Sequence, residues 1–163
     1  MPVDDVAVSV KHSSKATNDI AKLSASKLAE TERSTLVAAR LGQGRFRSMV
    51  LRHWSYRCAL TGVTTGAAIR ASHIKPWRHS TNAQRLDSYN GLPLVATIDT
   101  LFDAGYISFD GSGRILISDR LSATERVNLG VKTGQSIGKV HAQTKRYLEY
   151  HRSNVFLDGK NAR

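Results

Sequence analysis

The sequence predicts a small α+β protein made of one domain with helices at both ends. The chain has 163 residues, of which 40% are hydrophobic, and this suits one modest domain with room for an arm or linker. Leucines spaced among good helix formers indicate a helix over residues 21–41, and Val140, Tyr147 and Leu148 indicate another over 138–151. Between them, two stretches rich in turn residues, 58–74 and 106–118, read as β-hairpins.

The N-terminal part divides into an arm and two helices. Residues 1–20 are polar and aperiodic, as in a flexible arm. A helix is predicted over 21–41, and the glycines of the segment 42–44 are expected to break it. A second helix is predicted over 45–54. Four apolar residues are spaced to share one face of it: Phe46, Met49, Val50 and Trp54.

The middle of the chain is predicted to form a hairpin, a loop and a short helix. Residues 58–60 lead into a turn at 61–66, and 67–74 would be the returning strand. Pro76 ends this strand because proline cannot donate to a ladder. A polar loop follows over 77–89, and Trp77 in it is expected to plug the core rather than to stack on a base.

Beyond the loop, Gly91 and Pro93 are expected to keep the chain irregular. A short helix is then predicted over 96–103, ended by Gly105. Alternation around Asp110-Gly-Ser-Gly113 predicts the second hairpin, over 106–118. The last helix, 138–151, completes the expected order.

The charge distribution points to a polyanionic partner. Net charge is +11 and the pI is about 10.2. From Leu41 to Leu86 there are eight basic residues and no acid, and the next acid is Asp87. A basic surface of this kind suits a phosphate backbone, although it could also be a solvated face without function.

Compartment is predicted from what the sequence lacks. No apolar run approaches the length of a membrane span, and the first thirty residues contain no hydrophobic block of a signal peptide. The single cysteine, Cys58, rules out an intrachain disulfide and suits a reducing compartment. We therefore expect a cytoplasmic protein with no membrane partner.

Three residues occur in an order that phosphodiester hydrolysis requires. That reaction needs a base to deprotonate water, and histidine is the natural base near neutral pH. His73 ends an apolar stretch, Asn90 follows a polar loop, and Asp99 comes nine residues later where a helix should begin. Taken singly, His73 could be a packed histidine and Asn90 a turn residue.

A second carboxylate lies one helical turn after the first. Asp99 and Asp103 are four residues apart, so both can point to one side of the predicted helix. Like charges at this spacing repel unless a cation lies near them, which favours a metal site. Alternatively, Asp99 is simply placed where a helix N-terminus favours a carboxylate, and Asp103 caps backbone groups.

Together these residues resemble the HNH endonuclease family. The pair Ser72-His73, then Asn90, then Asp99 and Asp103 match in order the motif positions of its ββα-metal core. The resemblance covers residues 42–156. It rests further on Gly42-Gln-Gly-Arg-Phe-Arg47, Cys58-Ala-Leu-Thr-Gly62, Ala71-Ser-His-Ile-Lys-Pro-Trp77, Tyr89-Asn-Gly-Leu92, Asp99-Thr-Leu-Phe-Asp103 and Tyr150-His-Arg-Ser-Asn-Val-Phe156.

The resemblance implies roles for the site residues. His73 would be the general base, Asn90 would orient the loop that carries the base, and Asp99 would be the main metal ligand. Asp103 and Ser72 would assist at the metal. The flanking basic residues Arg70, Lys75 and Arg78 would bind phosphates.

It also implies which metals are used. The Cys-x-x-Cys zinc knuckles of many members are reduced here to Cys58, with Thr61, Val95 and Ile98 at the other three positions. A tetrahedral zinc site cannot be built from these, so no structural zinc is expected and Val95 and Ile98 should be core residues. Aspartate at position 99 is a hard oxygen ligand, so it favours one Mg²⁺ or Mn²⁺ ion in the active site.

The function implied is metal-dependent cleavage of DNA, with this chain serving as a module of a bacterial restriction or anti-phage defence system. A separate recognition or sensor domain would be its partner, and the oligomeric state is left open. The expected division is an arm with a helix over 1–41, the nuclease domain over 42–156 and a flexible tail over 157–163. The alternative is a noncatalytic nucleic-acid-binding domain that kept the fold.

Overall fold

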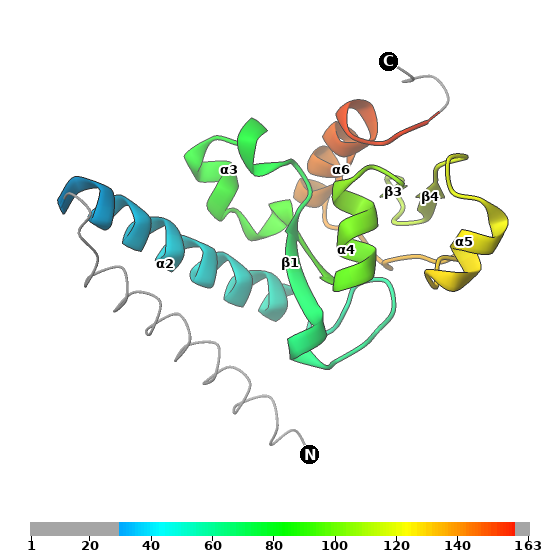
Figure 1. Ribbon diagram of the computed structural model, residues 1–163, viewed down its shortest axis with the longest axis horizontal. Coiled ribbons are helices and arrows are strands. Elements are labelled where there is room, and N and C mark those ends of the chain that lie inside the picture. Colours follow the sequence, from blue (N-terminus) through cyan, green and yellow to red (C-terminus); the bar gives the residue numbers. More distant parts are fainter. Residues whose placement is uncertain (1–29, 159–163) are drawn as a thin grey trace.

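The computed structural model describes residues 30–158 and confirms the α+β class, with small antiparallel sheets set among helices (Figure 1). Within the described part, no helix is both long enough and apolar enough to cross a membrane. The helices and strands, in chain order, are α2 (Glu30–His53), β1 (Ile69–His73), α3 (Asn82–Leu86), β2 (Gly91–Val95), α4 (Ala96–Asp103), β3 (Ile107–Phe109), β4 (Ile115–Ile117), α5 (Ala123–Asn128) and α6 (Ala142–Asn154).

Helix α2 is continuous through the segment where a break was predicted. It runs from Glu30 to His53, so Gly42 and Gly44 lie inside it. Phe46 and Val50 are buried, and their packing on the body of the protein holds the C-terminal half of the helix. Tertiary packing therefore outweighs the cost of the two glycines, about 1 kcal/mol each relative to alanine. The first part of the predicted helix, residues 21–29, lies outside the described residues.

The predicted pairing of the first hairpin is wrong. Strand β1 pairs antiparallel with β2, which follows a loop containing α3, and His73 lies opposite Gly91. Residues 58–60 form no strand; they contact the sheet through the Ala59 N–H, which donates to the Pro93 carbonyl at 2.8 Å. The turn residues at 61–66 suggested a local hairpin, whereas the actual partner comes from more distant sequence.

Gly91 and Pro93 lie within strand β2 and do not make the chain irregular, as had been predicted. A Cβ atom on Gly91 would lie 2.3 Å from Val50 Cγ2, so the glycine is what lets α2 approach the sheet. Pro93 is tolerated because β2 pairs with a single strand in the described part, which leaves one edge without a ladder. Two residues that signal irregularity in sequence therefore serve packing here.

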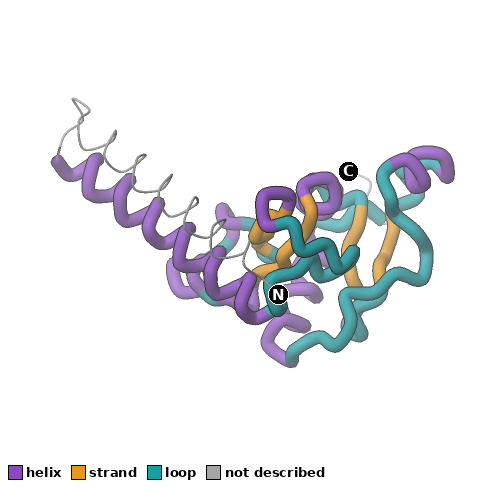
Figure 2. Tube along the Cα trace, turned by 90° about the horizontal axis from the view of Figure 1, so that it is seen from below, coloured by secondary structure: helices purple, strands orange, loops and turns teal. Residues whose placement is uncertain are grey.

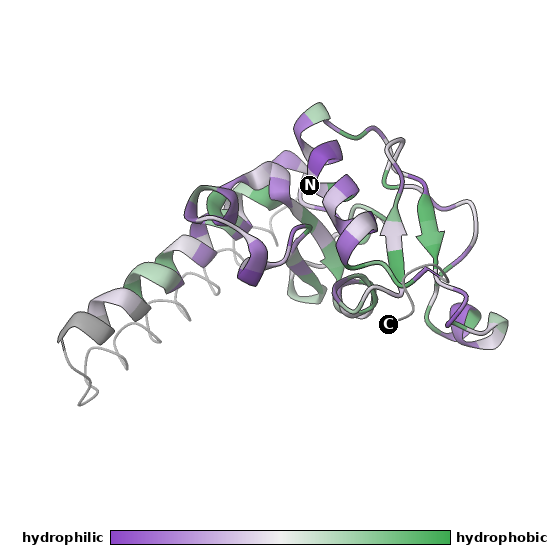
Figure 3. Ribbon diagram, turned by 90° about the horizontal axis from the view of Figure 1, so that it is seen from above, coloured by the Kyte–Doolittle hydropathy of each residue, from purple (hydrophilic) through white to green (hydrophobic). Residues whose placement is uncertain are grey.

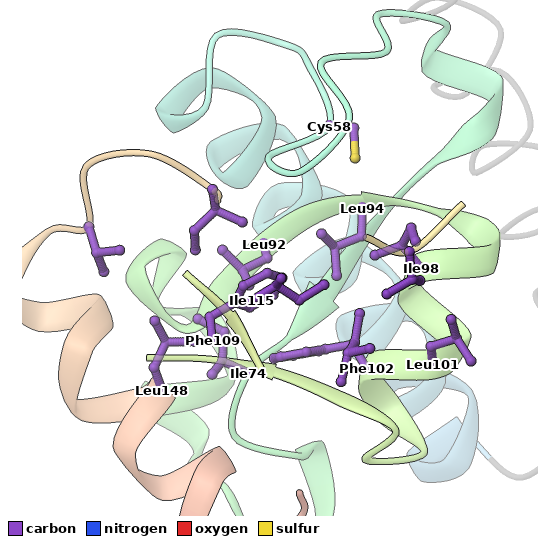
Figure 4. Packing of buried hydrophobic residues seen from close by; sticks show 14 of the residues in the cluster. Cys58, Ile74, Leu92, Leu94, Ile98, Leu101, Phe102, Phe109, Ile115 and Leu148 are labelled. Carbon is purple, nitrogen blue, oxygen red and sulfur yellow. The ribbon is translucent and has the colours of Figure 1, made fainter. Parts of the chain in front are cut away.

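One hydrophobic cluster joins the two sheets to α4 and α6. Its members are buried residues from these elements and from the segments between them, including Ile74, Leu92, Phe102, Phe109 and Leu148 (Figure 4). Strands β3 and β4 are largely hydrophobic, whereas the helices mix polar and apolar residues (Figure 3). The second hairpin and the C-terminal helix are confirmed, although α6 begins at Ala142 rather than at 138.

Cys58 connects the two segments that correspond to the expected knuckle positions. The Sγ atom of Cys58 is buried and accepts hydrogen bonds from the N–H groups of Thr61 and Val95, each at 3.4 Å. Ile98 is buried and Val95 partly so, both in or against the core cluster. Cys58 therefore joins the two knuckle segments through hydrogen bonds and packing.

His151 attaches α6 to the end of α4. Its ring is 1% exposed and lies parallel to Phe102 with 3.8 Å between centroids. Nε2 donates to the Phe102 carbonyl at 3.0 Å, so Nδ1 accepts from the Ser108 hydroxyl at 2.9 Å. Burial lowers the pKa of His151 to about 4, the Phe102 carbonyl opposing the shift and Arg152 adding to it. The ring is thus held neutral in the folded state.

Stability is expected to fall as pH drops from about 6.5 to 4. Between these values the unfolded chain binds a proton at His151 that the folded chain does not. The free energy of unfolding should therefore lose about 3 kcal/mol across this interval through His151 alone. Urea unfolding at several pH values, compared with the variant His151→Gln, isolates this contribution because other titrating groups are common to both proteins.

An NMR titration of the imidazole protons in the unmutated chain gives the same quantity directly. A His151 ring that titrates near 6.5 in the folded protein would contradict the prediction, as would a difference from His151→Gln that does not change with pH.

Candidate active site

Strand β1 sends alternate residues to two helices. His73 contacts α2, whereas Arg70 and Ser72 contact α4. Although side chains alternate across a strand, both sets line one cleft. This cleft has a volume of about 850 Å³ and is lined by all of β1 and by residues of both helices. Among its lining residues are His73, Ser72, Asp99, Asp103, Arg70 and Arg78.

His73 is held in the orientation and tautomer of a base. Its ring lies parallel to Phe46 of α2, with 3.9 Å between centroids, and edge-on to Trp77. Nε2 lies 2.9 Å from the Arg85 carbonyl, which can only accept, so Nε2 carries the proton. No described residue bonds to Nδ1, whose lone pair is left to take a proton. Burial lowers the pKa of His73; the hydrogen bond to the Arg85 carbonyl opposes this shift and the Arg85 charge adds to it, and with the pKa below its usual value the ring is neutral at pH 7.

Asn90 fixes the loop that holds His73. It is completely buried, and its Oδ1 accepts from the Lys75 N–H at 2.8 Å. Its Nδ2 donates to the Gln84 carbonyl at 3.0 Å. Gln84 precedes Arg85, whose carbonyl binds His73, so Asn90 joins Lys75, two residues after β1, to the helix that orients the ring. This geometry is what the predicted orienting role requires.

Asp99 and Asp103 project from α4 toward β1. Asp99 lies in the first turn of the helix, with Oδ2 at 3.8 Å from Arg70 Nε. Asp103 is the last residue of α4 and accepts a hydrogen bond from the Ser72 hydroxyl at 3.2 Å. The three residues predicted to surround a metal therefore lie together at one end of the cleft.

The two carboxyl groups are poorly compensated. Burial raises the pKa of Asp99, against the opposing effects of Ser72 and Arg70. Burial also raises the pKa of Asp103, and the charge of Asp99 raises it further. Two nearby carboxylates that each favour protonation would be relieved by a cation.

The residues present fit a hard divalent ion. They offer two carboxylates and a hydroxyl, all oxygen donors, and the described residues contain no cluster of three or more His, Cys, Asp or Glu side chains that could hold a metal. Mg²⁺ commonly binds through one or two carboxylates, with water and substrate phosphate completing its shell. This donor set is therefore sufficient for Mg²⁺ or Mn²⁺ and unsuited to a structural zinc.

The three predicted phosphate-binding residues lie in different places. Arg70 and Arg78 line the cleft, and the Arg70 side chain is 67% exposed. Lys75 does not line it: Nζ donates to Gln84 at 3.1 Å and lies over the Tyr150 ring. Lys75 thus tethers the loop to α6 in this structure.

Sequence reasoning missed the contribution of α2 and misplaced Trp77. Trp77 is 38% exposed and lines the cleft, with the Arg85 guanidinium over its ring, so the prediction of a core plug is wrong. Phe46 supports the base, and Arg47 lines the cleft beside it. Arg47 is one of the eight basic residues in the acid-free stretch from Leu41 to Leu86, and nothing in the sequence distinguishes it from the other seven.

Comparison with known proteins gives a family for the part that carries this site. Residues 58–110, from the knuckle through β3, match the family model described as HNH endonuclease. Over these residues the chain is similar to the HNH endonuclease family. That recognition was predicted from the motifs, and the matched segment includes the pair Ser72-His73, Asn90, Asp99 and Asp103.

The chain was also compared with curated proteins and with solved structures. No curated protein matches the chain. One solved structure that resembles it is a "Modification dependent TagI restriction endonuclease", at 21% sequence identity and a TM-score of 0.44. The match covers 71% of this chain and 40% of that one, so this chain spans less than half of the other protein's length.

Proposed function

We propose that this protein is an endonuclease that hydrolyses phosphodiester bonds in DNA with one divalent ion, Mg²⁺ or Mn²⁺. The observation that carries the proposal is the pairing, in one cleft, of a neutral histidine with a free Nδ1 and two adjacent carboxylates. The basic residues along the same cleft suit a polyanionic substrate.

In this mechanism His73 accepts a proton at Nδ1 from the attacking water. The Arg85 carbonyl and the Phe46 ring keep the imidazole aimed into the cleft, and Asn90 keeps the Arg85 carbonyl in place. Asp99, Asp103 and Ser72 would hold the ion, which would offset charge on the attacked phosphate and the departing oxygen. Arg70 and Arg78 would bind the phosphate backbone.

A noncatalytic nucleic-acid-binding domain is the second candidate. The observation that favours it is Ser72, whose hydroxyl is donated to Asp103 at the position where an anionic ligand is expected. We further propose that the domain is the cleavage module of a bacterial restriction or anti-phage defence system, working with a separate recognition or sensor domain.

Plasmid nicking tests the proposed function. Purified, chelator-washed protein is expected to convert supercoiled DNA to open-circular or linear DNA with Mg²⁺ or Mn²⁺, and not with EDTA. Binding of the same DNA without any conversion, in either metal and over a range of salt, would favour the noncatalytic alternative.

A further inference from the structure

Arg47 is a half-buried arginine that no carboxylate compensates. It lies on α2, next to Phe46, and lines the cleft. Its Nη1 donates to the Ile69 carbonyl at 2.8 Å and its Nη2 donates to the Gly66 carbonyl at 3.1 Å. Both partners are neutral, and no described carboxylate forms an ion pair with it. A guanidinium removed from water in this way still lacks an anion.

Arg47 is repelled by a second cation of the cleft, Arg70. Burial lowers the pKa of Arg47, and repulsion from Arg70 lowers it further. Arg70 follows Ile69 on β1, and its own ion pair with Asp99 is long, at 3.8 Å. Arg47 and Arg70 therefore place two positive charges along the same cleft, which Asp99 also lines.

The hydrogen bonds to the two carbonyls fix the Arg47 fork and leave donors free. A guanidinium has five N–H groups, and the bonds to Ile69 and Gly66 use two of them. The remaining three can bind phosphate oxygens, and a pre-positioned fork loses little entropy in doing so.

Gly44 adds an independent observation on the same helix. It lies three residues before Arg47, on a neighbouring part of the helix surface, and a Cβ atom there would have no atom within 4 Å. An exposed glycine inside a helix weakens it and here serves no internal packing. It would, however, allow a bulky partner to come close to the helix backbone beside Arg47. The N-terminal part of α2 extends away from the rest of the described residues (Figures 1 and 2).

We propose that Arg47, with Arg70 and the exposed backbone at Gly44, forms a second phosphate subsite that binds the DNA backbone next to the phosphate being cleaved. This inference rests on the proposed function, since it takes DNA as the substrate. Gln43, which precedes Gly44 and also lines the cleft, would contribute an uncharged contact to the same strand. Helix α2 would then both support the base and position the substrate.

Binding measured without catalysis tests the subsite. The full chain in EDTA is titrated into a short fluorescein-labelled duplex, and affinity is followed by anisotropy over a range of salt. Arg47→Gln should weaken binding on the order of tenfold and reduce the slope of log affinity against log salt by about one. Arg52→Gln is the control, because it removes the same charge from an exposed position of α2 outside the cleft. It should change affinity less than about twofold, since salt screens an exposed charge that does not contact the DNA.

A second variant guards against a folding defect, because Arg47 also ties α2 to β1. Gly44→Glu meets no internal atom and replaces glycine by a better helix former, so it should fold normally. It should nonetheless weaken DNA binding on the order of tenfold. Met49→Glu is its charge-matched control, about 140° farther around the helix. Melting curves of all four variants confirm folding.

The outcomes separate the subsite from the proposed function. Wild-type affinity in Gly44→Glu, or equal losses in Arg47→Gln and Arg52→Gln, would overturn the subsite while leaving nuclease activity untouched. Absence of DNA binding and of nicking by the unmutated protein would overturn the proposed function and the subsite together.

Discussion

Replacing His73 by alanine is expected to slow DNA cleavage by on the order of 10²–10⁴, the usual cost of losing a general base. Nδ1 is the ring nitrogen of His73 for which the described residues offer no hydrogen-bond partner. His73 lines the same cleft as Asp99 and Asp103. DNA binding in EDTA should change little, because the neutral ring contributes no charge. The measurement is the single-turnover rate with Mg²⁺, together with the dissociation constant.

A structural role must be separated from a chemical one, since His73 also packs on Phe46 and binds the Arg85 carbonyl. Imidazole added to His73→Ala should restore part of the rate, because the vacated ring opens into a cleft of about 850 Å³. His53→Ala, at an exposed histidine on the same helix that does not line the cleft, is the matched control and should cleave normally. Wild-type rates in His73→Ala would remove His73 from the mechanism.

The order of His73, Asn90 and Asp99 could be predicted from sequence because chemistry restricts which residue types serve as base, loop anchor and metal ligand. Their common location could be predicted only through the family resemblance. The structure supplies what neither contained: the Arg85 carbonyl that sets the tautomer of His73. Every residue has a backbone carbonyl, so the sequence does not reveal which one binds His73.

The errors in the fold have one physical origin. The glycines of α2 and the residues Gly91 and Pro93 are local signals for breaks, and each was overruled by packing between distant segments. Gly91 is the clearest case. Its missing side chain makes room for Val50, whose position depends on a helix some forty residues earlier. By contrast, the 106–118 hairpin and helix 96–103 are set by local turns and periodicity, and both were predicted correctly.

Replacing Asp99 by asparagine is expected to remove metal-dependent cleavage, whereas Asp103→Asn should lower it about 10–100-fold. Asp99 pairs with Arg70, near the start of β1, at the long distance of 3.8 Å, so its oxygens are weakly engaged by that partner. Asp103 already accepts the Ser72 hydroxyl and serves more to orient that pair. Extra Mn²⁺ should therefore partly rescue Asp103→Asn and not Asp99→Asn.

Melting temperatures test the roles of Asp99 and Asp103 as metal ligands without measuring activity. Without divalent ions, both variants should melt slightly above the unmutated protein at pH 7, because the raised pKa values mean that each charged carboxylate opposes folding. Adding Mg²⁺ should raise the melting temperature of the unmutated protein, since an ion bound only to the folded state stabilises it. That increase should vanish in Asp99→Asn and shrink in Asp103→Asn. Glu149→Gln, an exposed carboxylate on α6, should keep all of it. If Mg²⁺ raised the melting temperature of Asp99→Asn fully and that of Asp103→Asn not at all, the principal metal ligand would be Asp103 and not Asp99.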